Sequence, residues 1–318
     1  MRGRFFSDDS FWNQPIAEDA ETDDRSDDFL ERLAVEPGGA FWINCNEYAM
    51  PVYEVDENTP LRTVHQWEME PSRKPGRWAP RDKYWSHGPG FGKDVPIPDN
   101  AMPDPGTDAH LAVVDWSRNL VWDMWAARIR PDGEWESRTG MVYAADGPGV
   151  WKTEDFPIKN GESIHFYGPS RAAGVPIVAG LAMRHEILAG EIRHKIAMAT
   201  WHNAFQQFTA PAIWTDGFED GGLPEGAVMQ LDPGLDLSRY ELSPAATTLV
   251  RAMQKYGMVN VDNARGNAVY TEGVYGHPGW TWDGILSPDE LKQIPLEKYR
   301  VLKLGPITYM GDARSVNV

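Results

Sequence analysis

His110-Leu-Ala-Val-Val-Asp115 and Leu120-Val-Trp-Asp-Met-Trp-Ala126 are two mostly apolar runs, separated by the polar turn Asp115-Trp-Ser-Arg-Asn119. Two such runs on either side of a short turn are typical of a β-hairpin. Similar runs occur at 141–144, 163–167 and 194–201, and β-branched and aromatic residues are frequent between Phe41 and Val64. We therefore expect a mainly β chain, a sandwich or jelly-roll-like domain with a few peripheral short helices.

Signals for helix ends mark those peripheral helices. One predicted helix is capped by Ser26, and another begins at Ser243-Pro244 and ends at Gly257. A third follows a capping box at 287–290, and a fourth lies within 179–190. Residues 1–40 are expected to form an N-terminal arm with its short helix, anchored by Phe11, Trp12 and Ile16, and residues 41–318 a single β-rich domain. The proline-rich stretch 68–108 is expected to form ordered loops, since it is too aromatic for a flexible linker.

The composition argues against several classes of protein. The chain has 318 residues with 14 Trp, and its net charge is −17. A protein that binds the phosphate backbone needs a basic face, and no run of Lys or Arg provides one, so we expect no nucleic-acid partner. The simplest meaning of the charge is solubility. No segment approaches the roughly 20 apolar residues that span a bilayer, so no membrane span is expected.

The N-terminus and the cysteine content bear on the compartment. Cys45 is the only cysteine, which rules out a disulfide within the chain and a thiolate metal cluster. The stretch MRGRFFSDDSFWNQP lacks the apolar core of a signal peptide. The protein is therefore expected in the cytoplasm, or in a virion or outside the cell by another route. Oligomerisation is left open.

His110 is a candidate catalytic residue because it begins the first run of the hairpin. Its unperturbed pKa, about 6.5, suits a base or an acid near neutral pH. A hydrogen-bonded histidine at a strand end, with no catalytic role, is an equally good interpretation. The common hydrolase and nucleotide-binding signatures, such as H-E-x-x-H, G-x-S-x-G and the P-loop, are absent.

A second candidate group lies around Gly190. Glu186 and His194 flank this glycine, and a turn there could bring both of them beside His110. Such a set could abstract a proton, protonate a leaving oxygen or hold a divalent cation. The spacing does not choose among these, and a salt-bridged surface turn explains the residues equally well. No metal ligand is assigned.

Four tryptophans are candidates for stacking on sugar rings. Trp122 and Trp125 flank Asp123 in one strand and point to opposite faces, so at most one of them can line a site. Trp280 and Trp282 alternate onto one face, where a sugar ring could stack. A core role is the more common outcome for a tryptophan, and most of the 14 are expected in the core, which leaves Trp280, Trp282 and one of Trp122 or Trp125 as candidates.

Two polar stretches complete the candidates. The loop 214–222 is rich in carboxylates and glycine, and its Asp216 could serve catalysis or a hard cation such as calcium, although a solvated turn is the simpler interpretation. Val261-Asp-Asn263 resembles a strand that ends in an Asx turn, and both polar side chains could serve only that turn.

Several segments together resemble a group of bacterial proteins, often secreted and largely uncharacterised, that occur near polysaccharide-processing genes. The segments are Ile97-Pro-Asp-Asn100, 110–115, Gly168-Pro-Ser-Arg-Ala-Ala-Gly-Val-Pro-Ile177, Gly190-Glu-Ile-Arg-His194 and Tyr256-Gly-Met-Val-Asn-Val-Asp-Asn263, within a similarity over roughly residues 95 to 305. The matches to Ser170–Pro176, His110 and His194 recur in that group. Ala144 stands where the group has an acidic residue, and no leader is visible. The resemblance implies a carbohydrate context without implying a reaction.

These observations favour a carbohydrate-active enzyme that cleaves a polysaccharide. A glycoside hydrolase needs an acid and a base or nucleophile, for which Asp115, Glu186 and Asp216 are candidates. A polysaccharide lyase needs a base such as His110 or His194, and a cation or Arg184 to offset the uronate carboxylate. The alternative is a non-enzymatic protein, either a glycan-binding module or a structural component of a virion or cell surface.

Overall fold

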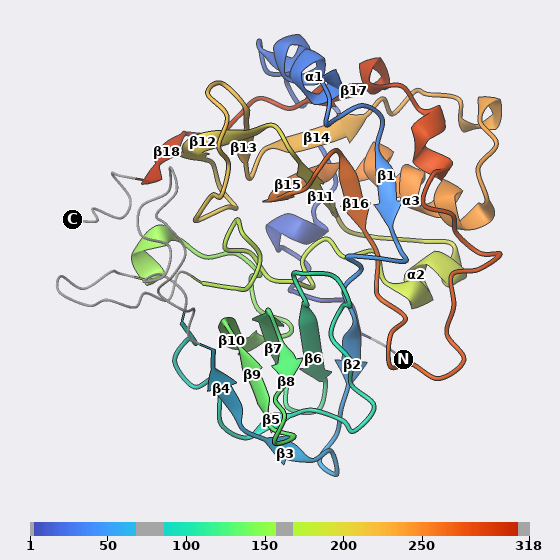
Figure 1. Cartoon of the computed structure of the whole chain (residues 1–318). Helices are drawn as coiled ribbons and strands as arrows, with labels where there is room; N and C mark the ends of the chain where they lie inside the picture. Colours follow the sequence, from blue (N-terminus) through green and yellow to red (C-terminus); the bar gives the residue numbers. More distant parts are fainter. Residues whose placement is uncertain (1–2, 68–85, 157–167, 311–318) are drawn as a thin grey trace.

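The computed structural model describes residues 3–67, 86–156 and 168–310. Strands hold 27% of the chain and helices 16%, which confirms the mainly β class with few short helices (Figure 1). The strand predicted at 163–167 and residues 68–85 of the ordered loop predicted at 68–108 lie outside the described residues. No helix in the described ranges is long and apolar enough to cross a membrane.

The largest sheet has six strands and lies in the upper half of Figure 1. Its order is β1 (Trp42–Asn44), β16 (Ala268–Tyr270), β11 (Ile196–Thr200), β15 (Met258–Asn263), β14 (Val228–Leu231) and β17 (Tyr299–Val301). The pairs β1–β16 and β11–β15 are parallel, and the other pairs are antiparallel. A register shift between Met198 and Ala199 interrupts the β11–β15 pair, and Asp262 lies opposite Ala199 just after it.

A four-stranded sheet forms the lower half of the molecule (Figure 1). Its order is β10 (Thr139–Ala144), β7 (Leu120–Trp125), β6 (Leu111–Asp115) and β2 (Val52–Glu54). The predicted hairpin is confirmed, because β6 and β7 pair antiparallel with Asp115 opposite Leu120. Alternate residues of β6 enter different cores, with Ala112 and Val114 on one face and Leu111 and Val113 on the other, as the two-residue period of a strand requires.

Three smaller sheets and several single-turn helices complete the described fold. The smaller sheets are β13 (Leu223–Glu225), β12 (Asn203–Phe208) and β18 (Thr308–Tyr309); β3 (Leu61–Arg62) and β5 (Val95–Pro96); and β4 (Val64–Gln66), β9 (Trp135–Ser137) and β8 (Arg128–Ile129). The 3-10 helices are η1 (Phe11–Asn13), η3 (Thr153–Asp155), η4 (Leu237–Arg239), η5 (Glu290–Gln293) and η6 (Leu296–Lys298).

The α-helices are α1 (Ser26–Ala34), α2 (Arg184–Ala189) and α3 (Pro244–Lys255). α3 begins as predicted, because the Ser243 hydroxyl accepts a hydrogen bond from the Ala246 N–H at 3.1 Å. The cap predicted for α1 is wrong, since Arg25 occupies that position and the Ser26 hydroxyl instead accepts from the Val301 N–H. The box predicted at 287–290 opens only the 3-10 helix η5, although Glu290 does accept from the Ser287 N–H.

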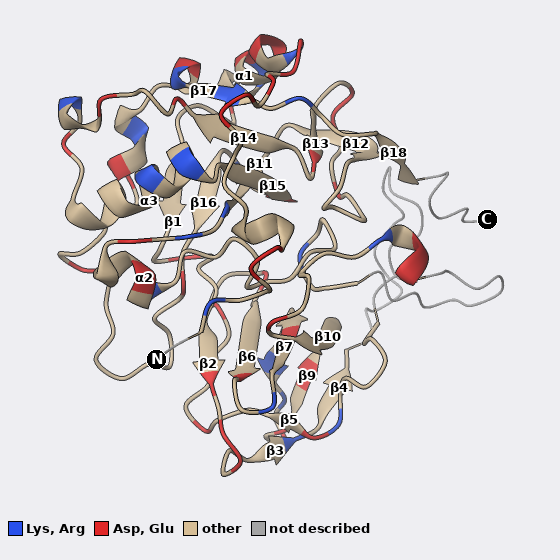
Figure 2. Cartoon of the chain, turned by 180° about the vertical axis from the view of Figure 1, so that it is seen from behind, with Lys and Arg blue, Asp and Glu red and all other residues tan. Residues whose placement is uncertain are grey.

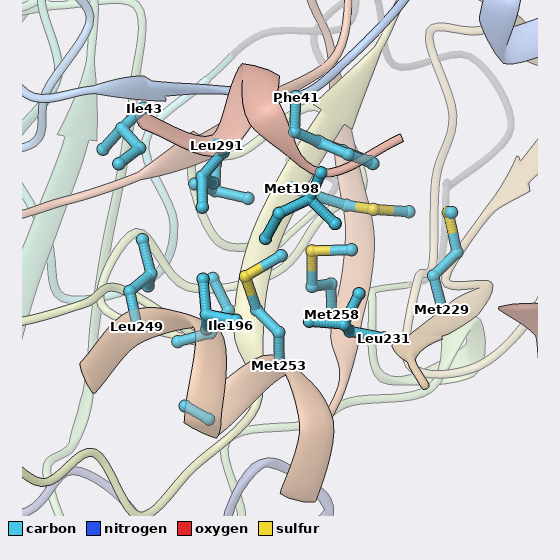
Figure 3. Close-up of a cluster of buried hydrophobic side chains, with 14 of the residues drawn as sticks. Phe41, Ile43, Ile196, Met198, Met229, Leu231, Leu249, Met253, Met258 and Leu291 are labelled. Carbon is cyan, nitrogen blue, oxygen red and sulfur yellow. The ribbon is translucent and has the colours of Figure 1, made fainter. Parts of the chain in front are cut away.

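α1 and α3 cover the six-stranded sheet and bury its main core. Figure 3 shows the centre of this core, where Met198, Met253 and Met258 meet Leu249 and Phe41. Other members include Phe29, Leu33 and Cys45, whose thiol is fully buried. Removing this many apolar side chains from water, at roughly 25 cal/mol per Å², is what holds the helices on the sheet.

The N-terminal arm is part of the fold and not a loose extension. Trp12 is 1% exposed, which confirms it as an anchor, and its indole N–H donates to the Gly149 carbonyl at 2.8 Å. Phe5 and Phe6 enter the same core cluster as Trp12. Ile16 continues the attachment by donating its N–H to the Lys255 carbonyl at the end of α3.

Candidate functional site

Three carboxyl groups from separate parts of the chain meet beside the six-stranded sheet. We call Asp216, Glu225 and Asp262 the carboxyl cluster. Asp216 lies in the loop after β12, Glu225 ends β13, and Asp262 lies near the end of β15. The carboxyl groups of Asp216 and Glu225 share a hydrogen bond, and the charge of Asp216 also acts on Asp262. The three carboxyl groups therefore influence one another's pKa values.

Backbone contacts of β12 explain why Asp216 is close to Glu225. The loop that carries Asp216 folds back onto β12, where the Phe205 N–H donates to the Glu219 carbonyl and the Glu219 N–H to the Asn203 carbonyl. Gly217 allows this approach, because a Cβ atom there would lie 2.2 Å from the Ala204 carbonyl oxygen. β13 pairs with the other edge of β12 and places Glu225 against the same strand.

Asn203 connects two members of the carboxyl cluster. Its side-chain amide is fully buried and donates to Glu225 Oε1 at 3.1 Å and to the Asp262 carbonyl at 2.8 Å. Its oxygen accepts from the Asn260 amide at 2.8 Å. A buried amide with all these partners satisfied fixes the spacing between β13 and β15.

Glu225 has a pKa well above its ordinary value. Its side chain is fully buried, and burial disfavours the charged form. The negative charge of Asp216 raises the pKa of Glu225 further, and a hydrogen bond from Thr215 opposes the shift. Glu225 Oε2 has no N–H or O–H donor. Its protonated form is therefore favoured, and that form can donate the hydrogen bond to Asp216.

Asp262 also has a raised pKa. Burial is the largest cause, followed by the negative charges of Asp216 and Asp108, while Arg171 and the Asn263 N–H oppose the shift. The Asx contact predicted at 261–263 is present, since Asp262 Oδ1 accepts from the Asn263 N–H at 3.0 Å. Asp262 thus serves the turn and lies beside other acids whose charges favour its protonated form.

The acids at the cluster differ in exposure. Asp262 is buried at 9% exposed, and Asp216 and Asp108 are half-buried. Asp108 precedes β6 of the lower sheet and accepts a hydrogen bond from the side chain of Trp125. The half-buried acids therefore come from both main sheets, and a half-buried tryptophan contacts one of them.

Aromatic residues flank Asp216 along its loop. Trp214 and Phe218 lie two residues before and after it, and both are half-buried. The Phe218 ring packs edge-on against Trp201, with 4.6 Å between the ring centres. Half-buried aromatic rings beside polar groups are typical of sugar-binding surfaces, because they provide apolar faces at a low entropic cost.

The loop 170–177 lies beneath the site. Arg171 is fully buried, and its guanidinium sits 4.5 Å from the centre of the Tyr270 ring and donates to the Ile177 carbonyl. Asp123 of β7 fixes both ends of this loop, because it accepts from the Ser170 hydroxyl at 2.9 Å and from the Ile177 N–H at 3.0 Å. The loop joins the lower sheet to the upper one.

His110, a predicted catalytic residue, lies behind this site. It is 4% exposed, and burial together with the charge of Arg171 lowers its pKa to about 3. In the described structure it makes no hydrogen bond or ion pair with His194 or Glu186. The predicted convergence of the three residues is not formed.

His194 and Glu186 do meet each other, as predicted. His194 Nε2 lies 3.0 Å from Glu186 Oε2, and its Nδ1 contacts the Lys195 carbonyl at 2.7 Å. Each charge favours the other, so the pKa of His194 is raised and that of Glu186 is lowered despite burial. The N-terminal arm covers the pair and leaves a cavity of about 10 Å³, roughly the space of one water molecule.

The other predicted catalytic carboxylate, Asp115, serves the hairpin turn. Its oxygens accept from the Ser117 hydroxyl and N–H and from the Arg118 N–H and side chain. These bonds overcome burial and lower its pKa to about 2.

The predicted sugar-stacking residues have different environments. Trp122 and Trp282 are 5% and 1% exposed, so neither ring offers a free face to a sugar. Trp280 is half-buried, with His277 stacked on it at 4.2 Å and the Arg184 guanidinium 5.1 Å from its ring centre. Of the four tryptophans predicted to stack on sugar rings, Trp125 is the one that borders the carboxyl cluster.

Among the described residues, no group of three or more His, Cys, Asp or Glu side chains has an arrangement suited to a metal ion. The cation considered for Asp216 or for the His194 pair therefore gains no support from this part of the chain. Comparison with known proteins adds no further candidate, since no family model, curated protein or solved structure matches the chain.

Sequence reasoning identified Asp216 but missed its partners. Glu225 sits in a short strand without a motif, and Asn203 had no local signal of a role. Arg171 lies within Ser170–Pro176, a segment that carries the resemblance, but that segment did not indicate its role. Asp262 had a signal, the polar pair that ends β15, but that signal also fits a turn. The pairing of β12 with β13 and the packing of β13 against β15, which no local pattern reveals, make these residues neighbours.

Proposed function

We propose that this protein is a glycoside hydrolase, a carbohydrate-active enzyme that cleaves a polysaccharide at the carboxyl cluster. The observation that carries the proposal is the meeting of three carboxyl groups, two of them with raised pKa values, beside half-buried aromatic residues. Asp262 and Glu225 have raised pKa values, and the charge responsible for part of both shifts is that of Asp216. Glycoside hydrolysis requires one protonated and one ionised carboxyl group at the same bond.

The roles follow from exposure and protonation. Asp262 has a raised pKa, which favours its protonated form, so we assign it as the general acid that protonates the glycosidic oxygen. Asp216 is half-buried, and its negative charge acts on both Asp262 and Glu225, so we assign it as the carboxylate that activates water or attacks the anomeric carbon. A raised pKa suits the general acid, because that group must hold its proton at the pH at which the enzyme works.

Glu225 is a positioning residue in this mechanism. It is fully buried and touches no substrate, but it donates a hydrogen bond to Asp216 and is itself held by Asn203. The bond orients the Asp216 carboxylate and stabilises its charge. Trp125, Trp214 and Phe218 would provide the apolar faces for sugar rings next to the reacting bond.

A lyase mechanism has less support. His110, which was considered as the base of a lyase, is 4% exposed. Arg171, the cation whose charge acts on His110, is fully buried. The other base, His194, is held by Glu186 under the N-terminal arm. Arg184, the residue considered for binding a uronate carboxylate, lies over Trp280 instead.

The test is release of reducing sugar from a panel of polysaccharides, followed by substitution of the two acids. Asp262→Asn and Asp216→Asn should each lower kcat by at least about 100-fold, the usual contribution of a positioned acid or base. Asp220→Asn, an exposed acid in the same loop, is the matched control and should retain activity. Circular dichroism and melting temperature show whether each variant is folded.

Three outcomes would contradict the proposal. Absorbance of an unsaturated uronate without hydrolysis would show a lyase. Binding of glycan without cleavage would favour the binding module or the structural component considered from the sequence. Full activity of folded Asp262→Asn and Asp216→Asn variants would place the reaction elsewhere.

A further inference from the structure

Asn263 contacts both of the acids that are assigned a role in the proposed reaction. Its side-chain nitrogen, Nδ2, lies 2.7 Å from Asp216 Oδ1 and 2.7 Å from the Asp216 carbonyl oxygen. Its backbone N–H donates to Asp262 Oδ1 at 3.0 Å. One residue thus links the carboxylate assigned as base or nucleophile to the carboxyl group assigned as general acid.

The two contacts of Nδ2 fix the direction of the Asp216 side chain. An amide nitrogen carries two N–H groups, so each of the two oxygens can accept one of them. One acceptor belongs to the backbone of Asp216 and the other to its carboxylate, so a single nitrogen holds the main chain and the side chain of that residue together. A hydrogen bond to a carboxylate also favours its ionised form, which is the form that a base or nucleophile requires.

Strand pairing fixes the position of Asn263 itself. This residue ends β15, where it lies opposite Thr200 of β11, and the N–H of the following Ala264 donates to the Thr200 carbonyl at 3.3 Å. The register shift in the same pair leaves Val261 without an opposite residue, directly before Asp262 and Asn263. Shifts of this kind are frequent next to active sites, where they change the direction in which the following side chains point.

Asp216 needs such support because it lies in a loop. Its loop joins β12 to β13, and β13 packs against β15 (Figure 2). Side chains on strands are placed more precisely than those on loops, so a reacting carboxylate on a loop has to be held by neighbours on strands. Glu225 at the end of β13 and Asn263 at the end of β15 both bond to the Asp216 carboxyl group.

From these contacts we infer that Asn263 is a positioning residue for the proposed hydrolysis, because it orients the Asp216 carboxylate relative to Asp262. The inference rests on the proposed function and deepens it. Asn263 acts through Asp216, so its removal should slow the chemical step more than it weakens the binding of the glycan. A reacting group that is misplaced by about 1 Å can cost as much as 100-fold in rate.

The experiment measures kcat and KM across pH for Asn263→Ala and Asn263→Leu, on a polysaccharide that the wild type cleaves. Leucine nearly keeps the side-chain volume but donates no hydrogen bond, so a loss shared by both variants does not come from a cavity. Both variants should lower kcat at least about 10-fold, the lower end for a lost hydrogen bond to a charged group, while KM changes little. The acidic limb of the kcat/KM profile should move to higher pH, because ionised Asp216 loses a donor.

The titratable neighbours of Asp216 stay in place in both variants. Glu225 on β13, Asp262 on β15 and Tyr270 on β16 each respond to the charge of Asp216, and none of them is replaced. A shift of the acidic limb therefore reports the lost amide. An acidic limb that stays in place in folded Asn263→Ala and Asn263→Leu variants would overturn the inference.

Gln254→Ala is the matched control for a purely structural amide. The Gln254 side chain in α3 donates to the Asp232 carbonyl at 2.9 Å and to the Leu235 carbonyl at 3.1 Å. Its removal should lower the melting temperature and leave the acidic limb where the wild type has it. An equal shift of the limb in Gln254→Ala would show that the shift follows loss of stability, and would overturn the inference.

A measurement that needs no substrate separates this inference from the proposed function. Carbon-13 NMR of labelled aspartate follows the titration of the Asp216 carboxyl group, whose signal is assigned by its loss in Asp216→Asn. A midpoint that rises in Asn263→Ala, in a protein that cleaves no glycan, would sustain the contact between Asn263 and Asp216 and overturn the hydrolase. Cleavage of glycan with an unmoved midpoint and an unmoved acidic limb would sustain the hydrolase and overturn the role of Asn263.

Discussion

At the scale of single residues, burial and hydrogen bonding give similar side chains opposite behaviour. Asp115 and Asp262 are both aspartates near strand ends. The first accepts several hydrogen bonds and has a pKa of about 2, whereas the second faces other acids and its pKa is well raised. The residue type therefore predicted the chemistry that was available, and the surroundings decide whether the charged or the protonated form of each aspartate is favoured.

The His194–Glu186 pair predicts a pH dependence of stability. The pKa of His194 rises above 6.5, so its contribution is complete below pH 6.5 and is lost as the pH rises through its folded pKa. The pKa of Glu186 falls below 4.5, so its contribution is complete above pH 4.5 and is lost as the pH falls through its folded pKa. Arg4 and His185 modify the two shifts without reversing them. The pair should stabilise the fold most between about pH 4.5 and 6.5.

Urea unfolding at pH 5.5 and pH 9 measures this effect in the wild type and in Glu186→Gln. The variant should lose more stability at pH 5.5 than at pH 9. Glu134→Gln, which removes the carboxylate of an exposed pair with His65, is the control and should show little change at either pH. An equal loss for Glu186→Gln at both pH values would mean that the ion pair does not form in solution.

At the scale of elements, strand pairing determines where the chemistry lies. β12 holds the site together because its first residue, Asn203, bonds to β13 and β15, and its backbone binds the loop that carries Asp216. β7 has a comparable role in the lower sheet, where Asp123 fixes the loop 170–177. Both polar links are buried, and a buried link of this kind is costly to break.

Asn203→Ala should therefore destabilise the protein by about 2–4 kcal/mol, because it leaves Glu225 Oε1, the Asp262 carbonyl and the Asn260 amide with fewer partners. Denaturant unfolding gives the loss. Gln207→Ala, at a half-buried position of the same strand, is the comparison and should cost much less. A loss below about 1 kcal/mol for Asn203→Ala would show that water replaces the amide at no great cost.

Local patterns predicted some of these elements and could not predict others. The hairpin of β6 and β7 and the start of α3 depend on neighbouring residues, so the turn at 115–119 and the Ser243 cap could be recognised. The parallel pairs β2–β6, β1–β16 and β11–β15 join strands far apart in the chain, and nothing in the short apolar runs specifies them. The carboxyl cluster depends on such distant pairings, which explains why Asp216 was identified and Glu225 was not.

At the scale of the whole molecule, the N-terminal arm binds both halves together. Phe5, Phe6 and Trp12 enter a core cluster that includes Val114 of the lower sheet and Val261 of the upper one. The arm then continues to α3 through Ile16 and to the upper core through α1. Trp12 was recognised as an anchor from the sequence, but Phe5, Phe6 and the two sheets that the arm joins were not.

Trp12→Ala should cost about 3–5 kcal/mol of stability, the usual range for removing a large buried aromatic side chain. Phe11→Ala, which truncates the neighbouring but only partly buried ring, should cost clearly less. Chemical unfolding followed by far-ultraviolet circular dichroism measures both. If the two losses are equal and small, the arm is not attached in solution as it is in the structure.

The burial of Cys45 in the upper core has a consequence for labelling experiments. Burial raises the pKa of this thiol to about 11, so almost none of it is the reactive thiolate at neutral pH. Alkylation of the native protein by iodoacetamide should be slow and should accelerate sharply on addition of denaturant. The single thiol is thus a built-in reporter of core opening, and an oxidising environment would leave it unmodified for as long as the fold persists.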